Sequence, residues 1–255
     1  GANRVTYLHY ANKIPWVNVR PAVVSHQQAE ATLNASHYGL ENAKKRILEY
    51  LVAYQTNPSA RGKVLCLVGA PGVGKTSLVK SIAQALERPF ALISTATHEE
   101  SLRGHAYTYV SAEPGDFTKA LCATHSQHPL ILLDEIDKAR QNTQALIEAL
   151  DPERNRSFFD SFMDFGINLS NVLFIATANN LENIPQALRD RMEIIQLEAY
   201  SLEDKINIAR NYFIPQLTKH ANLSDECIQQ LSDCIPQIIN YTSRSTDAND
   251  GVRSL

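Results

Sequence analysis

The sequence predicts an α/β protein in which helices flank a five-stranded parallel sheet and a small all-helical domain follows. Short apolar runs alternate with helical patterns as far as Tyr200, which is typical of parallel strands joined by helices. A glycine-rich loop joins the first apolar run to a helix, as phosphate-binding loops do. Beyond Tyr200 only helical patterns occur.

The predicted strands are short apolar runs, three of which follow a Pro or an Asn that can mark the strand start. Amphipathic helices are expected over Glu41 to Leu51 and, directly after the glycine-rich loop, over Ser77 to Leu86. The five strands are expected at Val64 to Val68, Phe90 to Ser94, Leu130 to Leu133, Val172 to Thr177 and Glu193 to Leu197.

We expect three parts: an N-terminal extension over residues 1–34, a large nucleotide-binding subdomain over residues 35–198, and a small helical subdomain over residues 199–255. The extension has a weak helical pattern over Ala29 to Ala35. A last helix begins near Gly251 and is cut short, so we expect a fragment. The C-terminal helices are expected at Ser201 to His220, Ser224 to Cys234 and Pro236 to Tyr241, before a polar loop at Thr242 to Gly251.

Composition is that of an ordinary globular protein, with 44% hydrophobic residues, a net charge of -3 and a pI near 6.3. Such a charge gives no indication of nucleic-acid binding, and the basic cluster Lys44-Lys45-Arg46 is interpreted as a solvated helix face. The four cysteines form no C-x-x-C pair, which favours reduced thiols in a reducing compartment. No apolar run is long enough for a membrane span, so a soluble protein is expected.

The glycine-rich segment Gly69-Ala70-Pro71-Gly72-Val73-Gly74-Lys75-Thr76 matches the complete G-x-x-x-x-G-K-T pattern. Its glycines would let backbone N–H groups point inward at a triphosphate. Lys75 would reach the β and γ phosphates, and the hydroxyl of Thr76 would hold Mg²⁺. The alternative is a glycine turn that only caps a helix. The predicted binding residues here are Gly69, Pro71, Gly72, Val73, Gly74, Lys75, Thr76 and Ser77.

Two carboxylates end the third predicted strand, in Ile131-Leu132-Leu133-Asp134-Glu135. The end of a buried strand can hold such groups rigidly. Asp134 would hold Mg²⁺ through water, and Glu135 would polarise the water that attacks the γ phosphate. Both acids could instead cap the helix expected near Ile136.

Asn179 follows the fourth strand, at the carboxyl edge where Glu135 is expected. An amide can orient a water through both its donor and its acceptor, although an Asn after a strand also forms turns. Arg191 precedes the fifth strand and could act across a subunit boundary as an arginine finger. Its alternative is a surface ion pair with Asp190 or Glu193, and Arg253 has the same two interpretations.

Together these residues resemble the AAA+ module of the Lon ATP-dependent proteases, in the family's order and over nearly the whole chain. The matching segments are His37 to Leu51, Leu65 to Thr76, Arg103 to His105, Leu132 to Lys138, Leu150 to Glu153, Phe174 to Asn179, Asp190 to Glu193 and Gly251 to Leu255. Tyr7 to Trp16 is similar to the helix and Pro-Trp that precede Lon's ATPase. The resemblance implies an AAA+ fold with a helical lid.

By this resemblance Lys75, Thr76, Asp134 and Glu135 are the Walker residues, Asn179 is sensor 1 and Arg191 is the arginine finger. Arg253 is then sensor 2, and Tyr38 and Gly39 border the adenine. The implied cofactors are ATP and Mg²⁺. Lon enzymes are hexameric rings that pull unfolded polypeptide into a Ser-Lys protease chamber, in the cytoplasm or the mitochondrial matrix.

Tyr109 and Val110 would be the aromatic-aliphatic pair of the first pore loop, because an exposed tyrosine supplies non-directional contact area. A buried structural tyrosine is the alternative. The chain departs from Lon here: it has Ala106-Tyr107 in place of two arginines, Ser111 in place of glycine, and Glu113 in place of methionine.

Three functions are compatible with the sequence. The first is the ATPase module of a Lon-like protease, acting on unfolded proteins, although no Ser-Lys motif of the Lon type occurs in the chain. The second is a non-proteolytic AAA+ remodeller of a specific protein partner. The third, a nucleotide-gated interaction module with poor turnover, is disfavoured by the presence of Glu135 and Arg191.

Overall fold

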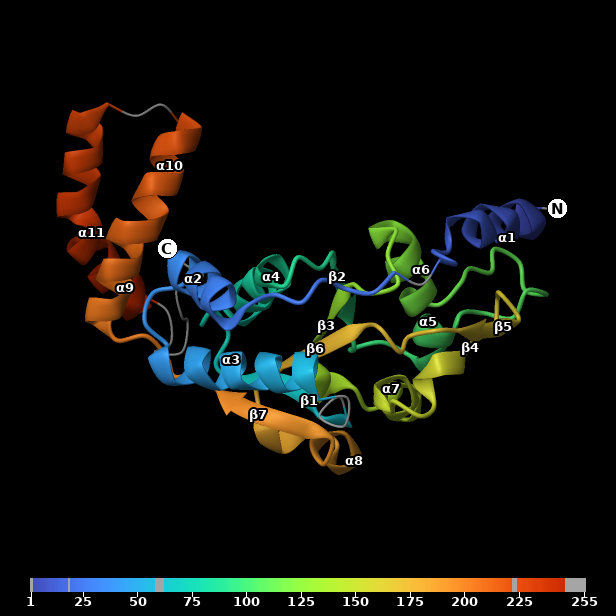
Figure 1. Ribbon diagram of the computed structural model, residues 1–255. Coiled ribbons are helices and arrows are strands. Elements are labelled where there is room, and N and C mark those ends of the chain that lie inside the picture. Colours follow the sequence, from blue (N-terminus) through green and yellow to red (C-terminus); the bar gives the residue numbers. More distant parts are fainter. Residues whose placement is uncertain (1, 18, 58–61, 222–223, 246–255) are drawn as a thin grey trace.

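The computed structural model describes residues 2–17, 19–57, 62–221 and 224–245 (Figure 1). A five-stranded parallel sheet forms its centre, with strand order β2-β3-β6-β1-β7. The predicted parallel sheet is therefore confirmed, with strand ends shifted by one residue at three strands. The strands are β1 (Val64–Val68), β2 (Phe90–Ser94), β3 (Leu130–Asp134), β6 (Leu173–Ala178) and β7 (Met192–Gln196).

Alternate residues of the central strands point to opposite faces of the sheet, and each face has its own apolar core. In β1, Leu65 and Leu67 join one core, whereas Cys66 and Val68 join the other. The first core is covered by α2 (His26–Ser36), α3 (Glu41–Thr56) and α4 (Lys75–Ala85). The second is covered by α5 (Glu99–Arg103), α6 (Asp116–Thr124), α7 (Thr143–Leu150) and α8 (Gln186–Arg189).

A small antiparallel hairpin, β4 (Phe158–Asp160) with β5 (Phe165–Ile167), lies at one end of the sheet. The sequence does not predict this hairpin, because each strand has only three residues and an apolar segment, Phe162-Met163, lies between them. Helix α1 (Ala2–Lys13) lies beside this hairpin, at the opposite end of the molecule from the C-terminal helices (Figure 1).

The C-terminal helices are α9 (Leu202–Ile208), a π-helical turn (Ala209–Phe213), α10 (Ile214–Ala221) and α11 (Asp225–Ser245). They project from the sheet as a separate group in Figure 1. Their own small core consists of Ala209, Ile214, Ile235 and Ile239, each buried.

The prediction of separate helices on either side of Pro236 is wrong, because α11 runs through this proline. Proline removes one hydrogen bond and normally breaks a helix. Here Ile235 and Ile239, four residues apart on one helix face, are both buried in the small core, and a continuous helix keeps both there. The expected loop from Thr242 is also wrong as far as Ser245; the remainder lies outside the described residues.

The interpretation of Lys44 as part of a solvated face is wrong. Lys44 is only 4% exposed, because the helical period places it with Ile47, Leu48 and Leu51 on the buried face of α3. Burial lowers the pKa of Lys44, and Glu41 partly opposes this with an ion pair at 3.8 Å.

The thiols are free, with Cys66 and Cys122 buried, whereas Cys227 and Cys234 are exposed. Within the described part of the chain, no helix is long and apolar enough to cross a membrane.

Candidate active site

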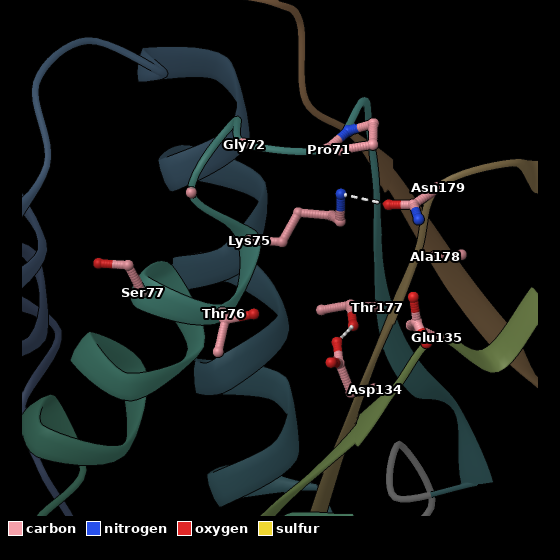
Figure 2. Close-up of a pocket in the computed structure, with 11 residues that line it drawn as sticks. Pro71, Gly72, Lys75, Thr76, Ser77, Asp134, Glu135, Thr177, Ala178 and Asn179 are labelled. Carbon is pink, nitrogen blue, oxygen red and sulfur yellow. Dashed lines mark hydrogen bonds between the residues drawn. The ribbon is translucent and has the colours of Figure 1, made fainter. Parts of the chain in front are cut away.

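A cleft of about 300 Å³ opens at the carboxyl edge of the sheet, where β1, β3 and β6 end (Figure 2). Parallel strands bring segments that are far apart in the sequence to one edge. The phosphate loop, both acids of the third strand and Asn179 therefore meet here. The lining residues are Pro71, Gly72, Gly74, Lys75, Thr76, Ser77, Asp134, Glu135, Thr177, Ala178 and Asn179.

The loop after β1 has the backbone that its glycines predict. Gly72 and Gly74 have φ angles of 81° and 93°, a region that other residues rarely adopt. A Cβ atom on Gly69 would lie 2.8 Å from the carbonyl oxygen of Leu197, so only glycine fits there. Val73 is fully buried beneath the loop and anchors it to the core.

Lys75 begins α4 and reaches back across the cleft (Figure 2). Its Nζ donates to the carbonyl oxygens of Gly69 at 2.6 Å and Ala70 at 3.0 Å, and to Asn179 Oδ1 at 2.9 Å. The ammonium group therefore already lies between the phosphate loop and Asn179, where an anionic ligand can compete for it.

Thr76 faces Asp134 across the cleft (Figure 2). Asp134 ends β3, and its Oδ1 accepts a hydrogen bond from Thr177 Oγ1 at 2.5 Å. The bond fixes one carboxylate oxygen and leaves the other for a ligand. A threonine hydroxyl and a carboxylate are hard oxygen donors of the kind that Mg²⁺ prefers, so these residues fit that ion.

Glu135 has a left-handed backbone, with φ 58° and ψ 47°, immediately after β3. The buried Thr95 supports this strained turn, because its Oγ1 donates to the carbonyl oxygens of Asp134 and Glu135, both at 2.9 Å. Lys138 Nζ forms an exposed ion pair with Glu135 Oε1 at 2.6 Å, and this hydrogen bond raises the pKa of Lys138. The helix expected near Ile136 is only the 3₁₀ turn Ile136–Lys138, and neither acid's side chain caps it.

The buried carboxylate of Asp137 holds the backbone at Asn179. The N–H groups of Asn179 and Asn180 both donate to Asp137 Oδ2 at 3.2 Å. Asp137 is 7% exposed, and its other oxygen is buried with no hydrogen-bond partner within the described structure. Asp137 therefore links the segment after Glu135 to the segment that carries Asn179.

Ser77 lines the cleft but its side chain points away from Lys75 and Asp134 (Figure 2). Its Oγ is hydrogen bonded to Nε2 of His37 at 3.1 Å. His37 is also bonded through Nδ1 to Ser36 Oγ at 2.8 Å. Burial, aided by the charge of Lys44, lowers the pKa of His37 to about 4. A neutral imidazole thus joins the end of α2 to the phosphate helix α4.

Tyr38 and Gly39 do not line the phosphate cleft. Gly39 borders a second hollow of about 260 Å³, which lies between the start of α3, the segment after β7 and Asp204 of α9. The Tyr38 hydroxyl accepts a hydrogen bond from Asn207 Nδ2 of α9 at 3.2 Å. These residues therefore lie where the sheet domain meets the C-terminal helices.

Arg191 lies at the opposite edge of the sheet. It immediately precedes β7, and its carbonyl oxygen accepts from the N–H of Val64 at the start of β1. A five-residue strand separates this edge from the phosphate loop, roughly 16 Å at the usual rise of a strand. Arg191 Nη2 lies 3.9 Å from Asp151 Oδ2; neither Asp190 nor Glu193 forms the expected pair with it among the described contacts.

Tyr109 and Val110 lie in the turn between α5 and α6 and are 66% and 95% exposed. The alternative that Tyr109 is a buried structural tyrosine is therefore wrong. Arg253 lies outside the described residues.

Thr95, Asp137, Thr177 and His37 support the cleft but were not among the predicted site residues. One sequence signal existed for Thr177: it is a polar residue in an apolar strand, two positions before Asn179 and thus on the same face. Asp137 and Thr95 gave no such signal, because their partners are backbone groups of other elements.

A complete phosphate loop after a buried parallel strand, opposite a carboxylate at the end of a neighbouring strand, defines the class of the protein as a P-loop nucleotide-binding protein. Residues 65–199 match the model of the "ATPase family associated with various cellular activities (AAA)". The chain belongs to the AAA family of ATPases.

Its similarity to individual proteins extends well beyond those residues. The chain is 43% identical to the mitochondrial Lon protease homologue of Drosophila melanogaster, over 98% of this chain and 25% of that protein. It is 42% identical to the mitochondrial homologue of Saccharomyces cerevisiae, over 98% of the chain and 22% of that protein. For the Lon protease of Clostridium acetobutylicum the identity is 43%, over 100% of the chain and 33% of that protein.

The resemblance to the AAA+ module of Lon is thus confirmed, and the chain spans about a fifth to a third of the length of the relatives it matches.

Proposed function

We propose that this chain binds ATP with Mg²⁺ in the cleft at the carboxyl edge of the sheet and hydrolyses it to ADP and phosphate. The observation that carries the proposal is the meeting of Lys75, Glu135 and Asn179 in one cleft with Thr76 and Asp134. Mere nucleotide binding needs neither a strained glutamate at the strand end nor an amide opposite the phosphate loop.

Each residue has a task in this proposal. The phosphate loop and Lys75 hold the β and γ phosphates, Thr76 and Asp134 hold Mg²⁺, and Tyr38 and Gly39 border the adenine. Bound Mg²⁺ neutralises phosphate charge. Glu135 takes the proton of the attacking water, and Asn179 orients that water. Ser77 contributes its backbone N–H, because its side chain is engaged with His37.

Arg191 is proposed to act on the site of a neighbouring subunit. It is too far from the phosphate loop of its own chain, and its guanidinium is only partly buried. A ring of identical subunits would bring the amino edge of one sheet against the carboxyl edge of the next. The proposed assembly is a homo-oligomer, a hexameric ring in the whole protein, as its resemblance to Lon implies.

The work driven by ATP is proposed to be the unfolding and threading of polypeptides, with Tyr109 and Val110 gripping the substrate. Their exposure supports this role. The relatives are named proteases, and we propose that the whole protein degrades what this module unfolds, in the cytoplasm or the mitochondrial matrix. A non-proteolytic remodeller is the second candidate, favoured by the altered sequence around Tyr107.

We propose the domain division 1–34, 35–198 and 199–255; the separate small core of the C-terminal helices supports its last boundary.

Substitution Glu135→Gln tests the proposal most directly. It keeps the size of the side chain but removes its basicity, so hydrolysis should fall about 100-fold or more. ATP affinity, measured by calorimetry, should stay within a few-fold of wild type. The control Glu182→Gln changes an exposed carboxylate that lines no part of the cleft. Unchanged turnover in Glu135→Gln would remove this residue from its proposed role.

A further inference from the structure

The loop of residues 105–114, which is exposed over residues 105–111, is fixed at its base by a buried carboxylate. Asp160 of β4 is 1% exposed, and its Oδ2 accepts from the N–H of Gly115 at 2.9 Å and from Thr118 Oγ1. Its Oδ1 accepts from the N–H groups of Phe162 and Met163 at 2.9 and 3.0 Å. The hairpin turn and the end of the loop are therefore one unit.

The tip of the same loop is held by helix α1. The side-chain amide of Asn3 donates to the carbonyl oxygens of Tyr107 at 2.8 Å and Tyr109 at 2.7 Å. An amide group has two N–H donors, so one side chain can satisfy both carbonyl oxygens. The backbone on either side of Thr108 is thus tied to a helix more than 100 residues away in the sequence.

Aromatic side chains add a second contact between α1 and the loop. Tyr7 and Tyr107 pack edge to face, with ring centroids 6.0 Å apart and planes at 87°. Phe162 of the hairpin turn lies 6.2 Å from Tyr7 and 5.6 Å from Tyr107. These three rings therefore join α1, the loop and the hairpin.

Asn3 and Tyr7 are four residues apart and lie on one face of α1. Tyr7, Tyr10 and Ala11 pack on the sheet's second core, and α1 has no fully buried residue of its own. The helix thus contacts the body through Tyr7, Tyr10 and Ala11, and the loop through Asn3 and Tyr7.

We propose that Asn3 and Tyr7 are positioning residues for the substrate-gripping loop, so that the placement of α1 sets how Tyr109 and Val110 are presented. The amide of Asn3 binds the backbone beside Tyr109 and leaves the side chains of Tyr109 and Val110 in solvent. Any displacement of α1 is then transmitted to the loop. The positioning itself does not depend on the proposed function; only its consequence for polypeptide substrates rests on that function.

Hydrogen exchange of the loop tests the positioning in the chain without nucleotide or substrate. Substitution Asn3→Asp keeps the shape but replaces both donors by acceptors, so exchange of the backbone amides of residues 107–110 should rise about fivefold or more. Asn12→Asp, an exposed position of the same helix, is the matched control and should leave the loop unchanged. Equal exchange in the two variants would overturn the role of Asn3.

Tyr7→Ala and Tyr7→Phe separate the contribution of the Tyr7 ring from that of its hydroxyl group. The alanine variant should raise loop exchange, and the phenylalanine variant should keep the wild-type rate, because the contacts of Tyr7 are made by its ring. The single tryptophan, Trp16, lies against Phe165 with centroids 5.6 Å apart. Its fluorescence reports whether α1 and its following segment remain docked. Faster loop exchange with altered Trp16 fluorescence would show loss of the whole helix and would contradict specific positioning.

Stimulation of hydrolysis by an unfolded polypeptide, reduced and carboxymethylated lactalbumin, tests the consequence. Asn3→Asp should keep the basal rate and lose at least half of the stimulation. A wild-type chain that hydrolyses ATP but is not stimulated would count against the polypeptide-threading function alone, because the exchange data decide the positioning independently. Full stimulation in Asn3→Asp despite faster exchange would overturn the consequence for substrates.

Discussion

The cleft at the carboxyl edge of the sheet and the loop around Tyr109 are built in opposite ways. Around the cleft, buried polar groups fix the reacting residues: Thr95 supports Glu135, Thr177 holds Asp134, and Asp137 holds Asn179. The loop exposes its aromatic and aliphatic side chains and is held at its tip by the side chains of α1. Hydrolysis, as proposed, needs fixed geometry, whereas the proposed contact with varied polypeptides needs exposed side chains.

The largest effect expected from a test of this comparison concerns Arg191, at the edge opposite the cleft. In an assembled ring, Arg191→Ala should lower hydrolysis about 1,000-fold, in the range of other arginine fingers. ATP binding should persist. Mixing Arg191→Ala subunits with Lys75→Ala subunits should restore part of the turnover, because some interfaces then combine an intact cleft with an intact arginine. If the mixture hydrolyses ATP no faster than either variant alone, Arg191 does not act on the site of a neighbouring subunit.

A second prediction concerns the pH dependence of stability that arises from His37, which joins α2 to α4. Burial lowers the pKa of His37 from 6.5 to about 4, so the folded protein binds this proton more weakly than the unfolded chain. Stability is therefore complete above the unfolded value and falls as the pH drops from about 6.5 towards 4, by up to about 3 kcal/mol. Urea unfolding between pH 7.5 and 4.5 measures it. His37→Gln should flatten this dependence; an equally steep profile would assign it to other groups.

The third prediction tests how strictly Asn179 must be held. Asp137→Asn replaces a buried charged acceptor with a neutral one, and Asp137→Ala leaves two backbone N–H groups without their acceptor. Turnover should fall roughly tenfold in the first variant and further in the second, since a small displacement near the reacting atoms is costly. The Kd for ATP should change little, because Asp137 does not line the cleft. A fall in ATP affinity equal to the fall in turnover would point to general disruption of the fold.

The smallest expected effect is on basal hydrolysis in Tyr109→Ala. The side chain of Tyr109 is two-thirds exposed and lies outside the cleft, so basal turnover and thermal stability should match wild type. Stimulation by an unfolded polypeptide should be lost, whereas Tyr109→Phe should retain it. A drop in basal turnover would show that the side chain of Tyr109 affects hydrolysis in the cleft directly.

Much of the fold followed from local pattern alone. Strands β1 and β2 have the predicted ends, because a short apolar run between helices is typical of a buried strand. The phosphate loop could also be predicted from the sequence, since its glycines stand where the local backbone needs positive φ angles. Local pattern failed at Pro236, where burial of Ile235 and Ile239 outweighs the cost of a proline inside a helix. It also failed at Lys44, a charged residue that the helical period places on the buried face of α3.

The sequence by itself determined the strand order along the chain, the phosphate loop and the family, because these depend on residues close together or on a preserved series of motifs. Only the tertiary structure decided which side chains support them. The contacts of Asp137 with Asn179, of His37 with Ser77, and of Asn3 with the loop at Tyr109 join segments separated by tens of residues or more. Such contacts depend on how whole elements pack, which no local pattern of residues encodes.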